Sequence, residues 1–527
     1  MAEQYTVTLD EQYGDAILNR TGDVTRLRKQ LKRKIFMNYS YLAKQNIPVH
    51  LGAMIIVAFI LRAALFIFLI QPRDGYNQPD TPSYHEAALS LAQGCGMFRL
   101  DLKQPIFWRT PGYPAYLAPF YSYLGPQKPA PFTAYRSAHH WAIWGQIVLC
   151  SFIPLLVFLL AHLLTNNLLI SLIAGWFFVV HLGSMLASAY LLTEALGMLF
   201  FYTFLILLFR QIIQPLSWHH WSVIAAALAL GGYTWMRPMG ECIGITASVL
   251  LLIFNQNSWS ENGKKAAFFF FIFAVLLAPW YIRNYRLTHD FFFCPVSGIY
   301  YNCFCVPKIL SRLENISIED AWKKAQVNAQ VACYKALQAC PAGVYLSPLA
   351  NKAAAVPIIL AYPLWFAWDW FKEVLKTTFD LYAYQLVTLY NGSFTWDPIQ
   401  EFLSQKLAAC LWTQNLPMYM RLAAWAELFI NIFLWVGIAY GIYCFVIQPL
   451  LVRAHHWAPL QLMSRVWWVA GTVMAATVAP SGGFGYARLR LPIEPLIVIL
   501  GLIGWYTFWL YTRPAKSTAQ KSLRKNR

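Results

Sequence analysis

Long runs of apolar residues recur along this 527-residue chain, and they restrict its fold more than any other feature. A helix of about 17 to 25 apolar residues is long enough to cross the hydrocarbon core of a bilayer. Only 12% of the residues are charged, whereas soluble proteins carry about 25%. The sequence therefore predicts an all-α polytopic membrane protein with about ten transmembrane helices (roughly 10 to 13). The runs begin near Val49, Trp141, Leu168, Leu186, Trp221, Gly240, Lys265, Leu422, Val466 and Leu491.

Basic residues predict how the chain is oriented, because cytoplasmic flanks of membrane spans carry an excess of Lys and Arg. The arm at 1–48 contains RLRKQLKRK, and the tail at 513–527 ends in KSLRKNR. With ten spans, the basic connections NQNSWSENGKK and VRAHHW fall on the same side as both termini, which we therefore expect to be cytoplasmic. This topology and attraction to anionic lipid headgroups account for the net charge of +18 without a nucleic-acid partner.

Two long segments fall on the outer side and divide the chain. They cover 71–140, within a transmembrane module at 49–286, and 287–421, ahead of the C-terminal helices at 422–512. Outer loops of this length, rich in Trp, Tyr and Pro, are usually functional. We expect both to carry amphipathic helices. Within the second, AAAVPIILAYPLWFAWDWF at 353–371 suits another span, an interfacial helix or a re-entrant helix.

Seven cysteines lie in the outer segments, and their pairing is open. An oxidising compartment allows disulfides within the cluster at 294–340, although spacing does not fix connectivity. Zinc is disfavoured because no histidine lies at ligand spacing among these cysteines. The chain also lacks a Gly-rich phosphate loop, so we expect a substrate that is lipid-borne or reached from the outer face. The cysteines are Cys95, Cys294, Cys303, Cys305, Cys333, Cys340 and Cys410.

The sequence PDTPSYHEAALSLAQG in the first outer segment predicts a short amphipathic helix. Thr81 suits the N-cap with Pro82 in the first turn, and Tyr84, Ala87, Ala88 and Leu91 share one face. Asp80 lies just ahead, where the helix dipole favours a carboxylate. A purely structural capping role for Asp80 is the alternative. The turn WRTPGYP follows, and its Arg109 can either face a phosphate or pair with an acid such as Asp101.

Ionisable residues also occur where the spans meet the outer face. Glu194 is expected about two turns inside the fourth span, where ionisable groups are functional candidates by default. The guanidinium fork suits phosphate, although arginines at span ends also snorkel to headgroups. These arginines are Arg237, Arg283, Arg286, Arg488 and Arg490.

Five motifs in this order resemble the bacterial members of the C superfamily of glycosyltransferases. They are PDTPSYHEAALSLAQGCGMF, RTPGYPAYLA, LLTEALG, APWYIRNYR and ARLRLPIEP. The nearest resemblance is to the dolichyl-phosphate-mannose protein mannosyltransferase family and the lipid A aminoarabinose transferases. It covers about 55–286 and the last span, and residues 300–465 match none of the family's motifs.

This resemblance implies an enzyme of the bacterial inner membrane that moves a sugar from a polyprenyl-phosphate donor to a lipid, glycan or protein acceptor at the periplasmic face. Asp80 takes the place of the family's catalytic acidic residue, and a carboxylate there can act as general base for the acceptor hydroxyl. The five arginines above are the candidates for donor-phosphate binding. A second acidic residue of the family has no clean match, so a divalent metal requirement stays open. Further site candidates are Tyr84, Arg109, Tyr113, Glu194 and Asp74, with Glu86 and Asp101 as other acids.

Two other functions remain as alternatives. A transporter or flippase of a lipid-linked or anionic substrate would use the same intramembrane charges, although such proteins usually show paired repeats. A glycan polymerase or ligase would share the outer arginines but leaves the Asp80 motif unexplained. Because no second carboxylate is well placed, direct displacement with inversion is expected for a transferase.

Overall fold

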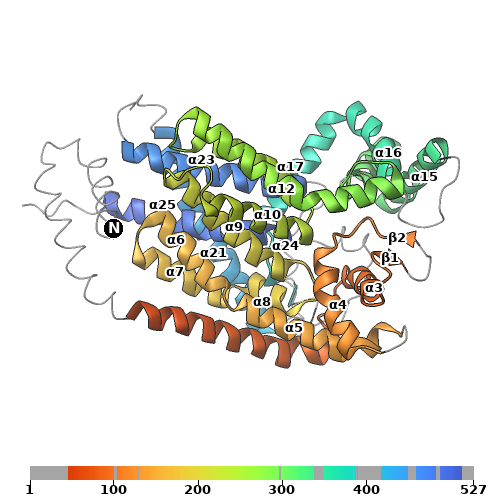
Figure 1. Cartoon of the computed structure of the whole chain (residues 1–527), viewed down its shortest axis with the longest axis horizontal. Coiled ribbons are helices and arrows are strands. Elements are labelled where there is room, and N and C mark those ends of the chain that lie inside the picture. The colour runs from red at the N-terminus through yellow and green to blue at the C-terminus, as the bar shows by residue number, and fades with distance from the viewer. Residues whose placement is uncertain are drawn as a thin grey trace, which may run out of the picture.

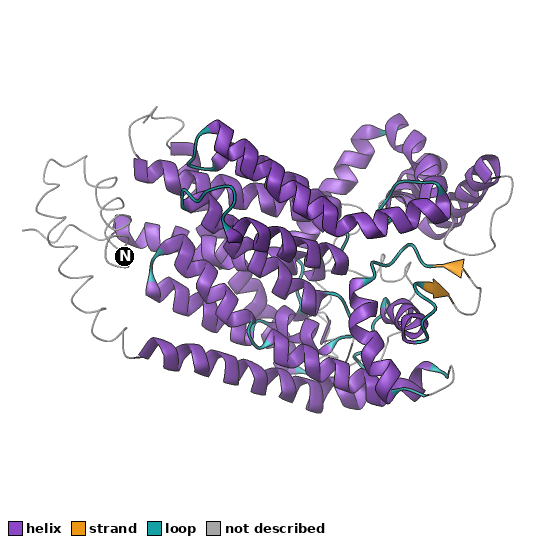
Figure 2. Cartoon of the chain, in the orientation of Figure 1, coloured by secondary structure: helices purple, strands orange, loops and turns teal. Residues whose placement is uncertain are grey.

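The computed structural model describes residues 46–99, 104–126, 130–295, 298, 300–337, 348–383, 385–386, 389, 417–448, 458–481 and 487–512. The predicted basic arm and tail lie almost wholly outside these residues. Nearly all of the described chain is helical (Figure 2), and its only strands are the short antiparallel pair β1 (Phe98–Arg99) and β2 (Gln104–Pro105). The prediction of an all-α polytopic membrane protein is confirmed.

Nine of the ten predicted apolar runs correspond to helical segments in the described part of the chain, whereas the run that begins near Leu186 is interrupted between Ala189 and Glu194. Six helices are long and apolar enough to span a membrane. The run at Leu168 is a bent pair, with 45° between its helices, and three further runs form shorter apolar helices. The long ones are Asn46–Arg73, Phe132–Thr165 (which includes α5, Arg136–Cys150, and α6, Ile153–Thr165), α9 (Glu194–Ile213), α12 (Trp259–Thr288), Met420–Ile447 (mostly α21, Met418–Ile442) and Ala487–Thr512 (which includes α24, Ala487–Arg490, and α25, Glu494–Thr512). The others are α7 (Leu168–Val180) with α8 (Leu182–Ala189), α10 (Trp221–Met236), α11 (Gly240–Phe254) and α23 (Ala458–Val478).

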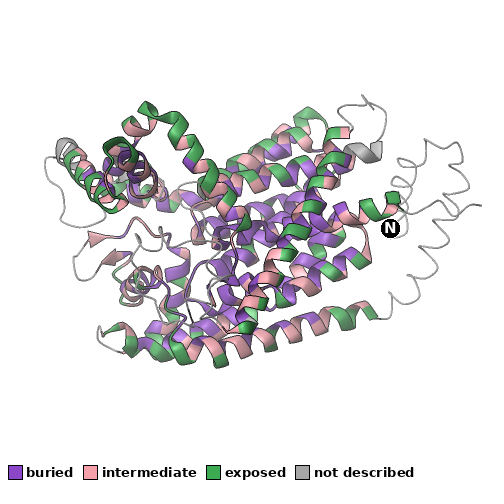
Figure 3. Cartoon of the chain, turned by 180° about the vertical axis from the view of Figure 1, so that it is seen from behind, coloured by how far each residue is buried: buried purple, intermediate pink, exposed green. Residues whose placement is uncertain are grey.

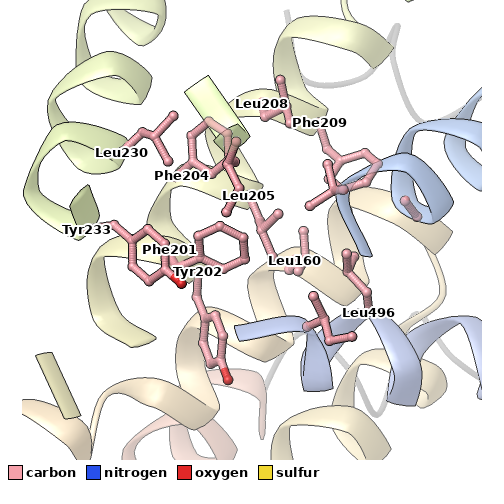
Figure 4. Packing of buried hydrophobic residues seen from close by; sticks show 14 of the residues in the cluster. Leu160, Phe201, Tyr202, Phe204, Leu205, Leu208, Phe209, Leu230, Tyr233 and Leu496 are labelled. Carbon is pink, nitrogen blue, oxygen red and sulfur yellow. The ribbon is translucent and has the colours of Figure 1, made fainter. Parts of the chain in front are cut away.

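Helix α9 lies at the centre of the bundle. Its Phe201, Tyr202 and Phe204 are fully buried, and Figure 4 shows them packed among side chains such as Leu160 of α6 and Leu496 of α25. Buried residues fill the middle of the bundle and exposed ones lie around it (Figure 3). Large apolar side chains such as Phe68 and Phe271 are among the exposed ones, as expected of a surface that faces lipid.

Small residues let two of the C-terminal helices approach closely. A Cβ on Gly504 of α25 would clash with the backbone of Gly437 in α21, and a Cβ on Gly501 would meet the backbone of Leu434. Glycines in such positions are typical of membrane helix pairs, because they replace side-chain contacts with close backbone packing.

The two long outer segments gather at one end of the bundle (Figure 1). The first contributes α3 (Thr81–Ala92), β1, β2 and α4 (Gly112–Leu124), and the second contributes α14 (Val306–Glu314), α15 (Ile318–Leu337), α16 (Pro348–Ala361) and α17 (Pro363–Phe379). Helices α16 and α17 meet at an angle of 107° around Tyr362. The stretch at 353–371 is therefore not one straight span, and Pro363 in the first turn of α17 suits a new helix start.

Two local predictions were wrong. The helix after Asp80 begins at Thr81, so Asp80 and not Thr81 holds the N-cap position, and its carboxylate makes no capping bond. The Thr81 hydroxyl instead accepts from the Gln78 amide and donates to the Leu191 carbonyl. Glu194 does not lie two turns inside a span, because α8 ends at Ala189 and α9 begins at Glu194 itself.

The predicted disulfide cluster is only partly described. Cys303 and Cys305 carry free thiols, as does Cys95 in the first outer segment. Cys340, Cys410 and the side chain of Cys333 lie outside the described residues. Any pairing that involves those three stays a prediction.

Candidate active site

Asp80 lies between two arginines that are far apart in the sequence. One carboxylate oxygen accepts from Nη2 of Arg109 at 2.6 Å, and the other accepts from Nη2 of Arg488 at 2.7 Å. Arg488 belongs to α24, at the start of the last span. The structure thus brings together the first outer segment and the C-terminal helices, two of the regions that carry the family motifs.

Arg109 is held in place by the turn that follows the hairpin. Its Nε donates to Ser83 at 2.7 Å, and its guanidinium lies 4.6 Å from the ring centroid of Tyr84. The next residue, Thr110, donates to the Met236 carbonyl at the end of α10. The Arg-Thr-Pro-Gly turn therefore packs on the end of α10 and aims Arg109 at Asp80.

Glycine is required in this turn. A Cβ on Gly112 would lie 2.6 Å from the backbone oxygen of Trp235, closer than a side chain tolerates. The close approach of the turn to α10 explains the purpose of this glycine, which the local sequence left open.

Glu194 contacts Arg488 as well and adds one further arginine, Arg237. Its Oε1 lies 3.0 Å from Nη1 of Arg237 and 3.0 Å from Nε of Arg488. Its position in the first turn of α9 adds the favourable field of the helix N-terminus. Because Arg488 contacts both carboxylates, it links Asp80 to Glu194.

The cluster has a closed inner side and an open outer side. The Glu194 side chain is 3% exposed and that of Arg237 is 11% exposed, whereas Asp80 is 28% exposed. Three guanidiniums face two carboxylates, so the cluster carries one excess positive charge. A partly open site with excess guanidinium charge suits an anionic group such as phosphate.

The pKa of the Asp80 carboxyl reflects two opposing effects. Burial alone would raise it, but the charges and hydrogen bonds of Arg109 and Arg488 outweigh burial and hold the pKa well below its ordinary value. Asp80 is therefore ionised over the physiological pH range. While both arginines are bound to it, it is also a weak base.

Tyrosines surround the cluster. Tyr84 receives a hydrogen bond from Arg109, and its ring packs edge-on against that of Tyr113, whose hydroxyl donates to Gln146 at 2.6 Å. Tyr300, from the second outer segment, lies within the electrostatic field of Asp80 and of the three arginines. Burial, with the charge of Asp80, raises the pKa of the Tyr300 hydroxyl. No sequence pattern pointed to Tyr300, because its segment matches none of the motifs.

Arg283 is engaged elsewhere. Its guanidinium donates to the backbone oxygens of Met97 and Ile106, at either side of the β1–β2 hairpin, and packs 4.3 Å from the ring centroid of Trp280. The structure gives it the task of holding the hairpin against α12. Arg286, on the same helix, is exposed.

Arg490 points away from the Asp80 cluster into a separate buried network. Its Nε donates to Glu494 at 2.6 Å, and its Nη1 donates to backbone oxygens at the end of α17. It is 1% exposed. Of the five predicted phosphate-binding arginines, the structure therefore brings Arg488 to Asp80 and Arg237 to Glu194, and Arg109 joins them in the same cluster.

The other predicted acids lie apart from the cluster. Asp74 forms an exposed ion pair with Arg136 at 2.8 Å, and Glu86 lies 3.6 Å from Arg99. Asp101 lies outside the described residues. Among the side chains that the structure describes, no group of three or more His, Cys, Asp or Glu residues is placed to hold a metal ion.

Comparisons with known proteins show a structural likeness but no sequence match. No family model matches the sequence, and no curated protein sequence matches it significantly. The fold is similar to that of an archaeal oligosaccharyltransferase, AglB from Archaeoglobus fulgidus, in complex with an inhibitory peptide and a dolichol-phosphate, with a TM-score of 0.45 and 12% sequence identity. The match covers 90% of this chain and 53% of that chain, so this chain spans about half the length of its structural neighbour.

Proposed function

We propose that this protein is a membrane glycosyltransferase that moves a sugar from a polyprenyl-phosphate donor to a lipid, glycan or protein acceptor at the outer face of the membrane. The observation that carries the proposal is the Asp80 carboxylate, held between Arg109 and Arg488 at the open edge of a cationic cluster. The motif resemblance supports the same function. Both termini are cytoplasmic in this proposal, and the cluster faces the periplasm.

The cationic cluster supplies what the leaving group needs. When the bond from the sugar to the phosphate breaks, negative charge grows on the departing polyprenyl phosphate. Guanidinium groups beside the leaving phosphate stabilise such charge, and one hydrogen-bond donor at a developing charge is worth about 2.7–4 kcal/mol in acyl-transfer enzymes. Arg109 and Arg488 are the accessible guanidiniums, and Glu194 holds Arg488 and Arg237 in place from below.

Donor binding activates Asp80 in this mechanism. The phosphate anion competes with Asp80 for the guanidiniums of Arg109 and Arg488. As these turn to the phosphate, Asp80 loses the contacts that depress its pKa and becomes a stronger base. Asp80 then accepts the proton of the acceptor hydroxyl while the hydroxyl oxygen attacks the anomeric carbon. Asp80 is therefore a strong base only after the donor phosphate has bound.

The placement of the carboxylates favours inversion. Within the described part of the cluster the carboxylates are Asp80 and Glu194, and Glu194 is almost fully buried between two arginines. Retention by double displacement needs a second accessible carboxylate as nucleophile. A single displacement by the acceptor, with Asp80 as base, inverts the anomeric configuration.

The test is release of polyprenyl phosphate by the purified protein in lipid nanodiscs. A panel of polyprenyl-phosphate sugars is incubated with membrane-extract acceptors, with and without a chelator, and the freed lipid phosphate is measured. We expect release from at least one donor, loss of that release in Asp80→Asn, and normal release in Asp74→Asn, a matched change at an exposed acid. Equal release by Asp80→Asn and the wild type would contradict the proposal, and the chelator samples report any metal requirement.

A further inference from the structure

The helical segment that carries Arg488 changes its hydrogen-bonding pattern shortly after this residue. Helix α24 spans only Ala487–Arg490, a single 3₁₀ turn follows at Leu491–Ile493, and α25 begins at Glu494. Pro492 and Pro495 lack the amide hydrogens that a continuous helix would use. Helical hydrogen bonding from α25 therefore does not fix the direction of the Arg488 side chain, so other contacts must do so.

The end of α17 provides these contacts. The Asp380 carboxylate, just beyond α17, accepts from the amide of Ala487 at 2.9 Å. In the opposite direction, Nη1 of Arg490 donates to the backbone oxygens of Thr378 at 2.6 Å and Asp380 at 3.0 Å. The residues on either side of Arg488 are thus each bonded to the same short stretch of the second outer segment.

Arg490 donates hydrogen bonds to backbone carbonyl groups at the C-terminal end of α17. The last carbonyl groups of an α-helix have no partner within the helix, and a buried helix end needs one. The Arg490 guanidinium supplies several donors in one plane, and a lysine in its place would offer a single nitrogen. Arg490 also donates to Glu494, which in turn accepts from the Tyr382 hydroxyl at 3.0 Å.

From these contacts we propose that Asp380, Arg490 and Glu494 are positioning residues that hold Arg488 between Asp80 and Glu194 and join the second outer segment to the cluster. We name these three residues the Arg488 clamp. The proposal rests on the proposed function, because it treats Arg488 as a phosphate-binding group. It assigns Arg490 a role through its neighbour and not through contact with the donor.

The clamp also gives the second outer segment influence over donor binding. Through its bond to the Ala487 amide, Asp380 transmits a displacement of the C-terminal end of α17 to the residue directly before Arg488. Segment 298–383 contains the bent α16–α17 pair and Tyr300, which lies in the field of the same cluster. Binding events on this segment thus have a direct structural route to the donor phosphate.

A double-mutant cycle tests the clamp with undecaprenyl monophosphate as the probe. Its Kd is measured in nanodiscs for the wild type, Asp380→Ala, Arg488→Ala and the double variant. We expect Asp380→Ala to weaken binding about tenfold when Arg488 is present, and by less than about twofold when Arg488 has been replaced by alanine. Asp380→Asn should restore binding to within about threefold, because its amide oxygen still accepts the Ala487 amide. Asp320→Ala, at an exposed acid of α15, is the control and should bind normally.

Other outcomes have defined meanings. Additive effects of Asp380→Ala and Arg488→Ala, or unchanged binding in Asp380→Ala, would overturn the clamp. Should Asp380→Ala not fold, Arg490→Lys takes its place, and additive weakening with Arg488→Ala overturns the clamp equally. If the wild type binds undecaprenyl phosphate and Arg488→Ala binds it equally well, Arg488 is not a phosphate ligand. That result would also overturn the clamp. Absence of sugar transfer together with intact coupling in the cycle would refute the proposed function alone.

Discussion

Replacing Arg488 with glutamine should disable the site in a way that the pH dependence reveals. Arg488 donates to Asp80 at 2.7 Å and lies 3.0 Å from Glu194. The variant therefore removes a positive charge that both carboxylates contact. The change preserves a polar side chain of moderate length. It therefore tests the charge rather than the packing of this position.

The expected magnitude follows from two losses. The pair with Asp80 is partly exposed, so solvent screening limits its value to about 1 kcal/mol or less. The larger loss is the guanidinium beside the departing phosphate, about 2.7–4 kcal/mol, or roughly 10²–10³ in rate. We expect kcat/KM to fall by about 100-fold or more. Glu194 retains Arg237, so the variant should still fold.

The pH dependence has a definite sign. Asp80 acts as a base only when deprotonated, and Arg109 and Arg488 hold its pKa below the ordinary value of about 3.9. Loss of one arginine raises that pKa, so the acid limb of kcat/KM, which reports the free enzyme, moves to higher pH. Transfer rates are measured from about pH 3.5 to pH 7.5. The wild type and the exposed-site control Arg286→Gln should show no Asp80 acid limb in this range, because their Asp80 pKa lies below it, whereas in Arg488→Gln the limb should enter the range. An unshifted acid limb, or a fall in kcat/KM below about threefold, would refute the reasoning.

Three further changes probe other parts of the site. Glu194→Gln should lower the free energy of unfolding by about 3 kcal/mol, because it leaves two guanidiniums without their shared buried acid, and a melting point equal to the wild type in detergent would contradict this. Tyr84→Phe keeps the ring under Arg109 and should lower transfer by less than about fivefold, whereas Tyr84→Leu should cost more than tenfold; equal effects would remove the stacking role. Arg283→Ala should speed amide hydrogen exchange in strands β1 and β2, because it removes the bonds to Met97 and Ile106. The Kd for undecaprenyl phosphate should change by less than about threefold, and a larger loss of binding would show that Arg283 is a phosphate ligand.

Periodicity and composition predicted the helical membrane fold well, because each apolar run has only one way to cross a membrane. The errors arose where a run is locally ambiguous. The residues before Glu194 read as a continuous apolar helix, but the chain bends at His181 and turns again after Ala189. Arg62 is fully buried at that bend, where it donates to Phe178 and Ser184. Such long-range packing is not visible in the sequence of the segment itself.

In the candidate site, too, the local sequence predicted single residues but not their long-range contacts. Asp80 was predicted from the motif and its position before a helix, but its bond to Arg488 joins residues 408 positions apart. Five arginines at span ends were equivalent by sequence, and only packing decides which of them face Asp80. Residues two apart on a helix point about 200° apart, so Arg488 and Arg490 could not both face one site, although both were predicted as phosphate ligands.

In the proposed mechanism the donor phosphate and Asp80 compete for the guanidiniums of Arg109 and Arg488. The most direct measurement is the Kd of undecaprenyl monophosphate for Asp80→Asn and for the wild type, with sugar transfer measured on the same samples. We expect Asp80→Asn to lose transfer yet bind the lipid phosphate more tightly, by about fivefold for a partly exposed pair worth about 1 kcal/mol. Weaker binding in Asp80→Asn, or unchanged binding with full transfer, would contradict it.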